Sequence, residues 1–342
     1  MPSWSAIAAE IDDLRKYNAQ NAFDSVRRKY LVAARQKTGR AVILYATKWS
    51  TPDPNVPPEM LSIHDGDLQG LMEVFHGVQE KELDLIIHSP GGQIDAADAM
   101  VSYLRSKFTH IRAIVPNAAM SAAGMIACAA DRIVMGKHSF LGPADPQFTL
   151  PTTLGGHRQV AVQSIIEQFE RAKKECMNDP RALAVWAPIL TQYGPDLIVQ
   201  AERASLLSNT LVDKWLRENM FKADPDGPQK AAKAATWLSS HENFNSHGRH
   251  LDRDSLRAQG LVVDSLEDDE EEQDIFLSIF HAATLTMMGT GAAKIIENHL
   301  GKAYINQVQT ILVQQPPQQA QPAPSRQYLQ PPQKNRGPNR RR

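Results

Sequence analysis

The feature that most constrains the fold is a series of short apolar runs separated by segments of helical periodicity. The runs are AVILYAT (41–47), LDLIIHS (83–89), IRAIV (111–115) and DRIVMG (131–136). Apolar runs of this length are typical of strands buried on both faces. Between the second and third runs, apolar residues recur at helical spacing: Ile94, Ala97, Val101 and Leu104. Alternation of this kind predicts an α/β fold with a largely parallel sheet.

Two adjacent glycines follow the second run, in IIHSPGGQID (86–95). Glycines let the backbone turn sharply and approach a ligand without side-chain obstruction, with N–H groups free to donate. Gly91 and Gly92 are therefore candidate donors for one half of an oxyanion hole.

Ser121 stands alone among small residues in NAAMSAAGMIA (117–127). We expect a short buried helix to begin just after it, so that the N–H of Ala122 has no partner within the helix and can supply the second half of the hole. Each motif alone is weak, because PGG is a common turn and a serine at a helix start commonly caps that helix. Their order within one strand–helix–strand unit favours a nucleophile.

Composition excludes several classes of protein. The chain has 342 residues, 42% of them apolar, and its 37 Lys and Arg nearly balance its 38 Asp and Glu. We therefore expect a globular protein whose net charge does not attract it to nucleic acid or to an anionic membrane. Cys128 and Cys176 both lie in apolar helical patterns, where we expect each to pack as a small apolar residue rather than to form a disulfide. A chain without disulfides is typical of a reducing compartment. Without a secretory signal, and with Pro116 and many alanines in the uncharged stretch 113–130, the sequence predicts a cytoplasmic protein with no membrane span.

The rest of the chain predicts an organisation in three parts. Residues 1–40 form an N-terminal helical arm, and residues 41–305 form the main domain, with a helical insertion over 157–245. Residues 248–266 read as a turn, a short helix and the last strand. Residues 313–342 are rich in proline and glutamine and end in three arginines, so we expect a disordered basic tail, capable at most of weak contact with nucleic acid.

A block of acidic residues, 267–272 and Asp274, precedes an apolar helix. Acids at a helix N-terminus complement its dipole, and we prefer this interpretation to a metal site. The histidines His241, His247 and His250 lack the one-turn spacing of a helical zinc site, which favours hydrogen bonding over metal binding.

The chain resembles the serine dehydrogenase proteinase family in IIHSPGG, AMSAAGMIACAADRIVMG and KHSFLGPADPQF. That family belongs to the Clp protease and crotonase superfamily and is similar in its core to signal peptide peptidase A. The resemblance covers about residues 25–305. It implies a stacked βαβ spiral, a serine peptidase with Ser121 as nucleophile and hole amides from the SPGG turn and Ala122. It also implies a peptide or protein substrate, no cofactor or metal, and a homo-oligomer.

The general base is less clearly marked. Clp peptidases carry a histidine after the serine, in the region where this chain reads SFLGPADP. Signal peptide peptidases instead use a lysine, which must be neutral to accept the serine proton. On a helix over 157–177, Lys173 lies within the apolar arc, either as a side chain that reaches solvent from the edge of the buried face or as the base. His138, Asp145 and His247 are alternative bases or orienting residues.

Two other hypotheses stay open. A crotonase-like acyl-CoA enzyme would use the same oxyanion hole with Asp145 as acid or base, and a non-catalytic oligomeric scaffold would keep only the fold.

Overall fold

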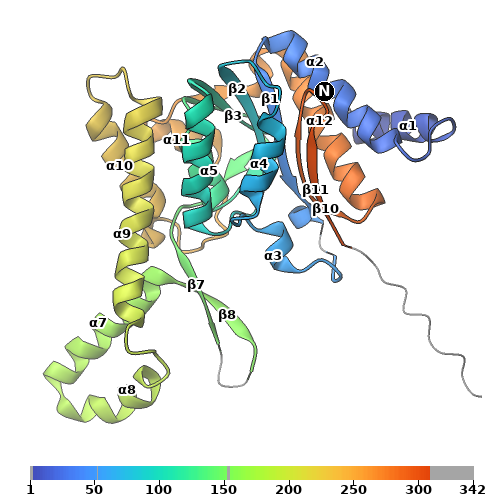
Figure 1. The fold of residues 1–342 in the computed structure, drawn as a ribbon. Coiled ribbons are helices and arrows are strands. Elements are labelled where there is room, and N and C mark those ends of the chain that lie inside the picture. Colours follow the sequence, from blue (N-terminus) through green and yellow to red (C-terminus); the bar gives the residue numbers. More distant parts are fainter. Residues whose placement is uncertain (1–2, 52, 152–154, 309–342) are drawn as a thin grey trace, which may run out of the picture. The chain divides into compact units, whose positions relative to one another are not determined.

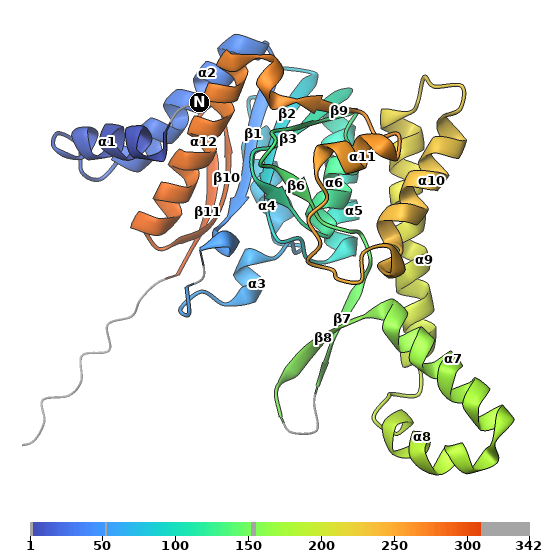
Figure 2. The ribbon, with the colours of Figure 1, turned by 180° about the vertical axis from the view of Figure 1, so that it is seen from behind.

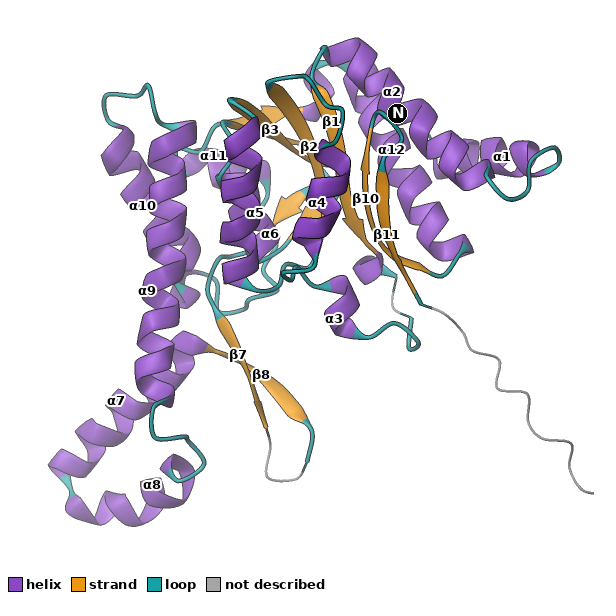
Figure 3. Ribbon diagram, viewed as in Figure 1, coloured by secondary structure: helices purple, strands orange, loops and turns teal. Residues whose placement is uncertain are grey.

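The computed structural model describes residues 3–51, 53–151 and 155–308; the predicted tail at 313–342 lies outside them. Within these residues the central sheet has seven strands in the order β11-β10-β1-β2-β3-β5-β9. Its parallel strands are β1 (Ala41–Thr47), β2 (Glu82–His88), β3 (His110–Val115), β5 (Arg132–Met135) and β9 (Val263–Ser265). The predicted α/β class with a mostly parallel sheet is confirmed, and the four apolar runs are the first four of these strands. Figure 3 shows β1, β2 and β3 within this sheet.

Helices cover both faces of the sheet. One face packs against α4 (Asp67–Phe75), α5 (Ile94–Lys107) and α6 (Ala122–Cys128), and the other against α2 (Ala22–Thr38) and α12 (Glu270–Gly289). In β1, Ile43 and Tyr45 face the first group, whereas Val42 and Leu44 face the second. Because both sets of side chains are buried, the strand is apolar throughout. Figure 1 shows α4 and α5 in front of the sheet, and Figure 2 shows α2 and α12 from behind.

Two antiparallel strands that the sequence analysis did not predict extend the sheet beyond β1. They are β10 (Ala292–Asn298), which pairs with β1, and β11 (Ala303–Gln307). Every residue of β10 is buried, including Lys294, Glu297 and Asn298. Because of these polar residues, the strand does not appear as an apolar run in the sequence. The two charged residues form buried ion pairs, Lys294 with Asp67 and Glu297 with Arg27.

The N-terminal residues are helical, as predicted. Helix α1 (Trp4–Arg15) and α2 pack on α12 through a small apolar cluster that includes Ile7, Ile11, Val26 and Ala282. In the part of the chain that the structure describes, no helix combines the length and the apolar character needed to span a membrane.

A hairpin that the sequence analysis did not predict overlaps the start of the segment predicted as a helical insertion, 157–245. Strands β7 (Gln147–Pro151) and β8 (His157–Ala161) pair antiparallel, and α7 (Val162–Asn178), α8 (Leu183–Leu190), α9 (Leu197–Trp215) and α10 (Gly227–Ser239) follow. The prediction of one helix over 157–177 is therefore wrong for residues 157–161, which pair with β7. Figure 1 shows the hairpin with α7 and α8 extending away from the sheet, while α9 and α10 lie beside α5 and α11 (Arg253–Ala258).

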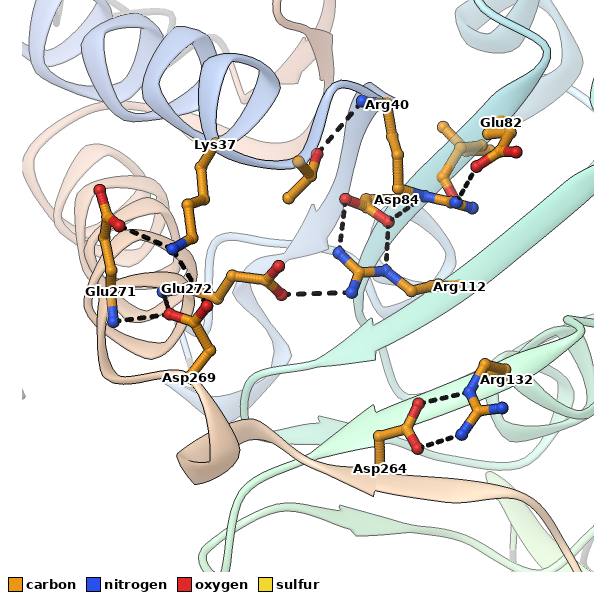
Figure 4. Close-up of polar contacts among 12 residues, drawn as sticks. Lys37, Arg40, Glu82, Asp84, Arg112, Arg132, Asp264, Asp269, Glu271 and Glu272 are labelled. Carbon is orange, nitrogen blue, oxygen red and sulfur yellow. Dashed lines mark hydrogen bonds and ion pairs between the residues drawn. The ribbon is translucent and has the colours of Figure 1, made fainter.

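Charged side chains form a network near the edge where the parallel strands begin (Figure 4). Arg112 of β3 binds Asp84 of β2 at 2.7 Å and Glu272 of α12 at 3.2 Å. The acidic run lies at the start of α12, as predicted, where Asp269 caps the helix by accepting two backbone N–H bonds at 3.0 Å. Lys37 pairs with Asp269 and Glu271, so basic side chains neutralise this part of the acidic run and the network reads as structural.

Candidate active site

A cleft of about 680 Å³ lies at the carboxyl end of β2, between the turn that follows this strand, the start of α6, the β7–β8 hairpin and α9. Its lining includes Gly91, Gly92, Ser121, Ala122 and His247. Open α/β sheets commonly bind ligands beyond the carboxyl ends of their strands. The two motifs that the sequence analysis singled out therefore meet in one cavity.

Ser121 has a strained backbone at the entrance to α6. Its φ of 50° and ψ of −126° lie where residues other than glycine are seldom found. Although Ser121 occupies the N-cap position, its side chain makes no capping hydrogen bond. The backbone is held on both sides, because the N–H of Met120 donates to the Ser89 carbonyl at 2.9 Å and the N–H of Met125 to the Ser121 carbonyl at 3.0 Å. Ser121 therefore lines the cleft from a strained turn that leads into a helix, as the serine does in the G-x-S-x-G turn of α/β-hydrolases.

The glycine turn packs directly against this serine. A Cβ atom added to Gly91, whose φ is 93°, would lie 2.7 Å from Ser121 Cβ and 2.9 Å from Ala122 N, so a side chain has no room there. The N–H of Gly91 donates to Ser89 Oγ at 3.2 Å. Among the described residues, the N–H groups of Gly92 and Ala122 donate to no acceptor. Gly92 and Ala122, one from each motif, therefore bring to the cleft lining backbone donors that are unpaired within the described part of the chain.

Asp145 lies buried behind the cleft and binds two histidines. Its Oδ1 accepts from Nδ1 of His247 at 2.8 Å, and its Oδ2 accepts from Nδ1 of His241 at 2.7 Å. Asp145 is 2% exposed, and a buried carboxylate needs such donors. With hydrogen on Nδ1, the neutral imidazole keeps Nε2 as an acceptor. His247 lines the cleft, whereas His241 does not.

Backbone hydrogen bonds fix Asp145 in place. The N–H of Ala144 donates to the Leu238 carbonyl of α10 at 2.8 Å, and the Pro146 carbonyl accepts from the N–H of Val162 at 3.0 Å. The segment that carries both histidines follows α10 and turns at Asn245, whose φ is 55°, a left-handed conformation that asparagine tolerates. The carboxylate and the imidazoles therefore come from two segments that converge at the end of α10.

The other predicted bases lie elsewhere. Nε2 of His138 donates to the Pro116 carbonyl at 2.9 Å, and His138 does not line the cleft. Lys173 is outside the cleft as well: its side chain is 56% exposed and lies 3.4 Å from Glu170. Ala172, the residue before Lys173 on α7, is 1% exposed, so the helix is still covered at this level and Lys173 lies on its exposed side. Within one chain, the structure does not bring Lys173 to Ser121.

His250, the third member of the histidine group, stacks on Phe140 with ring centroids 3.6 Å apart. His241 was considered only as a member of this group, and its bond to Asp145 is a contact that the sequence analysis missed. The two residues are 96 positions apart, and no local spacing relates them.

Comparison with known proteins gives a family and two relatives. Residues 60–186 match the family described as ClpP-like SDH-type serine proteinase, which confirms the resemblance seen in the sequence. One uncharacterized protein of Methanocaldococcus jannaschii is 40% identical over 207 residues, which span 60% of this chain and 62% of that protein. A second is 35% identical over 187 residues, spanning 55% of this chain and 53% of that protein. The chain thus spans less than two thirds of either relative's length. The family match includes Ser121 and Asp145 but ends before His247.

Proposed function

We propose that this chain, which matches the ClpP-like SDH-type serine proteinases over residues 60–186, is a serine peptidase with Ser121, His247 and Asp145 as its catalytic triad. The observation that carries the proposal is the contact between Asp145 and His247, which orients an imidazole in the cleft that also holds Ser121. A nucleophile, a base and a group that orients the base are the recurring parts of such sites on unrelated folds.

In the proposed acylation step, Ser121 Oγ attacks the carbonyl carbon of the scissile peptide bond, and Nε2 of His247 accepts the hydroxyl proton. The carbonyl oxygen becomes an oxyanion in a tetrahedral intermediate. When the C–N bond breaks, His247 returns the proton to the leaving amine and Ser121 holds the acyl group as an ester. Asp145 stays a carboxylate throughout and stabilises the imidazolium that His247 forms in the intermediate.

Deacylation repeats these steps with water as the nucleophile. His247 removes a proton from water, which attacks the ester carbonyl, and the proton then passes to Ser121 Oγ as the carboxylate product leaves.

The oxyanion would be bound by the N–H groups of Gly92 and Ala122, which have no other acceptor within the described part of the chain. Donors of this kind each lower the barrier by about 3 to 4 kcal/mol. Gly91 contributes in another way: its lack of a side chain lets the turn approach Ser121 and Ala122.

The position of Asp145 disfavours crotonase-like acyl-CoA chemistry. As acid or base, this carboxylate would have to reach the substrate. It is buried, it is not among the residues that line the cleft, and both of its oxygens accept from histidines.

The family resemblance also leads us to propose a peptide or protein substrate, and a homo-oligomer that acts in the cytoplasm. Multi-angle light scattering of the purified protein would measure the assembly; a monomeric mass would contradict that part of the proposal.

Labelling with a fluorophosphonate, followed by intact-mass measurement, tests the triad. We expect one adduct on the wild type and on Lys173→Ala, none on Ser121→Ala, and strongly slowed labelling of His247→Ala. Loss of labelling in Lys173→Ala, with labelling kept in His247→Ala, would replace the triad by a serine–lysine pair. An unlabelled wild type would favour the scaffold hypothesis.

A further inference from the structure

A buried ion pair lies beneath one wall of the cleft and takes no part in the chemistry proposed above. Lys294 of β10 and Asp67 of α4 have fully buried side chains, and Nζ of Lys294 lies 2.7 Å and 2.9 Å from the two oxygens of Asp67. Asp67 also accepts from the Tyr45 hydroxyl at 2.7 Å. Burial lowers the pKa of Lys294, and the Asp67 carboxylate opposes that change.

Each partner of this pair also binds the backbone of the cleft wall. Nζ of Lys294 donates to the Ser62 carbonyl at 2.8 Å, and Asp67 Oδ2 accepts from the backbone N–H of His64 at 3.1 Å. Ser62, Ile63 and His64 all line the cleft. The ion pair therefore holds this three-residue segment at both of its ends.

The residue between these two anchors clamps the glycine turn. The N–H of Ile63 donates to the Gly91 carbonyl at 2.8 Å, and its carbonyl accepts from the N–H of Gln93 at 2.9 Å. Gly92 lies between those two bonds, so close to Ile63 that an added Cβ would be 2.4 Å from both Ile63 N and Ile63 O. The position of Ile63 thus fixes the peptide plane that carries the free N–H of Gly92.

We propose that Lys294 and Asp67 are positioning residues for the oxyanion hole, acting through the segment 62–64 to aim the N–H of Gly92 into the cleft. The inference rests on the proposed function for its catalytic meaning. A buried ion pair contributes little net stability compared with apolar residues of similar size, because desolvation offsets the attraction. Two hydrogen bonds join the pair to the cleft wall, one to the Ser62 carbonyl and one from the N–H of His64, and they define one geometry for this segment. A displacement of about 1 Å at a catalytic donor lowers rates by up to about 100-fold.

The test uses the double variant Lys294→Met with Asp67→Asn. Asparagine can still accept from the N–H of His64 and from Tyr45, and no unpaired charge is left inside the protein. What the variant lacks is the ammonium group that holds the Ser62 carbonyl. Arg27→Met serves as the control, because Arg27 and Glu297 form another fully buried ion pair at the same strand, β10, with no contact to the cleft wall. In this variant Glu297 keeps its ion pair with Arg28 at 2.8 Å.

Two readouts separate this inference from the proposed function. Hydrogen exchange of the amides of Ile63 and Gln93 measures how stable the two bonds between Ile63 and the glycine turn are, and it does not depend on catalysis. We expect exchange at least about 10-fold faster in the double variant but not in Arg27→Met. For hydrolysis of a peptide ester, we expect kcat to fall about 10- to 100-fold with KM within about twofold, because the missing interaction acts on the transition state.

Unchanged exchange at both amides in a folded double variant would overturn the inference, as would equal acceleration in Arg27→Met. An inactive wild type with the expected exchange pattern would instead count against the peptidase, while the clamp would stand.

Discussion

Asp145 binds two histidines, and the effects of replacing each of them can be compared directly. His241 and His247 each donate Nδ1–H to one of its oxygens, at 2.7 and 2.8 Å, and their side chains are 19% and 20% exposed. Replacing either by alanine removes a similar bond from a similar environment. Only His247 lines the cleft with Ser121, so only His247→Ala should also remove the general base.

The two variants should differ in kcat but not in stability. A hydrogen bond to a charged group contributes about 1.5 to 3 kcal/mol, so the two variants should lose similar free energies of unfolding. Loss of a triad base lowers kcat by about 10⁶-fold, a barrier increase of about 8 kcal/mol. His241→Ala leaves Asp145 with its bond to His247, and we expect kcat to fall only about 10-fold.

The assay is hydrolysis of an activated peptide ester, with kcat and KM measured for both variants and unfolding followed by thermal melting. Equal losses of kcat in the two variants, at equal stability, would refute the assignment of His247 as the base. A larger loss in His241→Ala would move the base to that residue.

Three further predictions concern single positions. His88 is buried, which lowers its pKa from 6.5 to about 4, so only the unfolded chain binds this proton between those values. Stability should be fully present above pH 6.5 and fall by about 3 kcal/mol as the pH drops to 4, and urea titrations of His88→Gln should lose that slope. Gly92→Ala should lower kcat about 100- to 1,000-fold in ester hydrolysis, because a Cβ would meet the Ile63 backbone at 2.4 Å and move the donor. Burial raises the pKa of the Cys128 thiol to about 12, so iodoacetamide at pH 8 should alkylate Cys176 and leave Cys128 intact, as measured by intact mass.

Each of these has a control. His76 is exposed, so His76→Gln should keep the pH slope of the wild type. Gly260 has a φ of 92° and no atom near an added Cβ, so Gly260→Ala should reduce stability but keep kcat. Urea should expose Cys128 to alkylation. An unchanged slope in His88→Gln, full activity in Gly92→Ala or rapid alkylation of native Cys128 would contradict the corresponding argument.

The sequence was informative where local chemistry decides the structure. Strands buried on both faces appear as apolar runs, so β1, β2, β3 and β5 could be predicted. The glycine turn was recognisable because few residue types fit its backbone conformation, and Ser121 because it stands alone among small residues in the strand–helix–strand unit that also holds this turn. Strand β10 was missed because its buried Lys294 and Glu297 are matched by residues more than 200 positions away.

The proposed general base could not be identified from the sequence, because its identity also depends on contacts between residues far apart in the chain. Lys173 was selected by its position on a helical arc, but the covered part of the helix surface is narrower than that arc: Ala172 is buried, whereas the adjacent Lys173 side chain is 56% exposed. Asp145 and His247 were named only as alternatives, because their contact joins segments 102 residues apart and depends on how α10 packs. Tertiary packing, rather than spacing, determines that His247 and not His241 lines the cleft with Ser121.

The most direct test of the central claim is cleavage of a reduced, unfolded protein, with the new termini identified by mass spectrometry for the wild type, Ser121→Ala and His247→Ala. We predict new termini with the wild type and none with either variant. An intact substrate after incubation with folded wild type, or equal cleavage by Ser121→Ala, would contradict a peptidase that acts through Ser121.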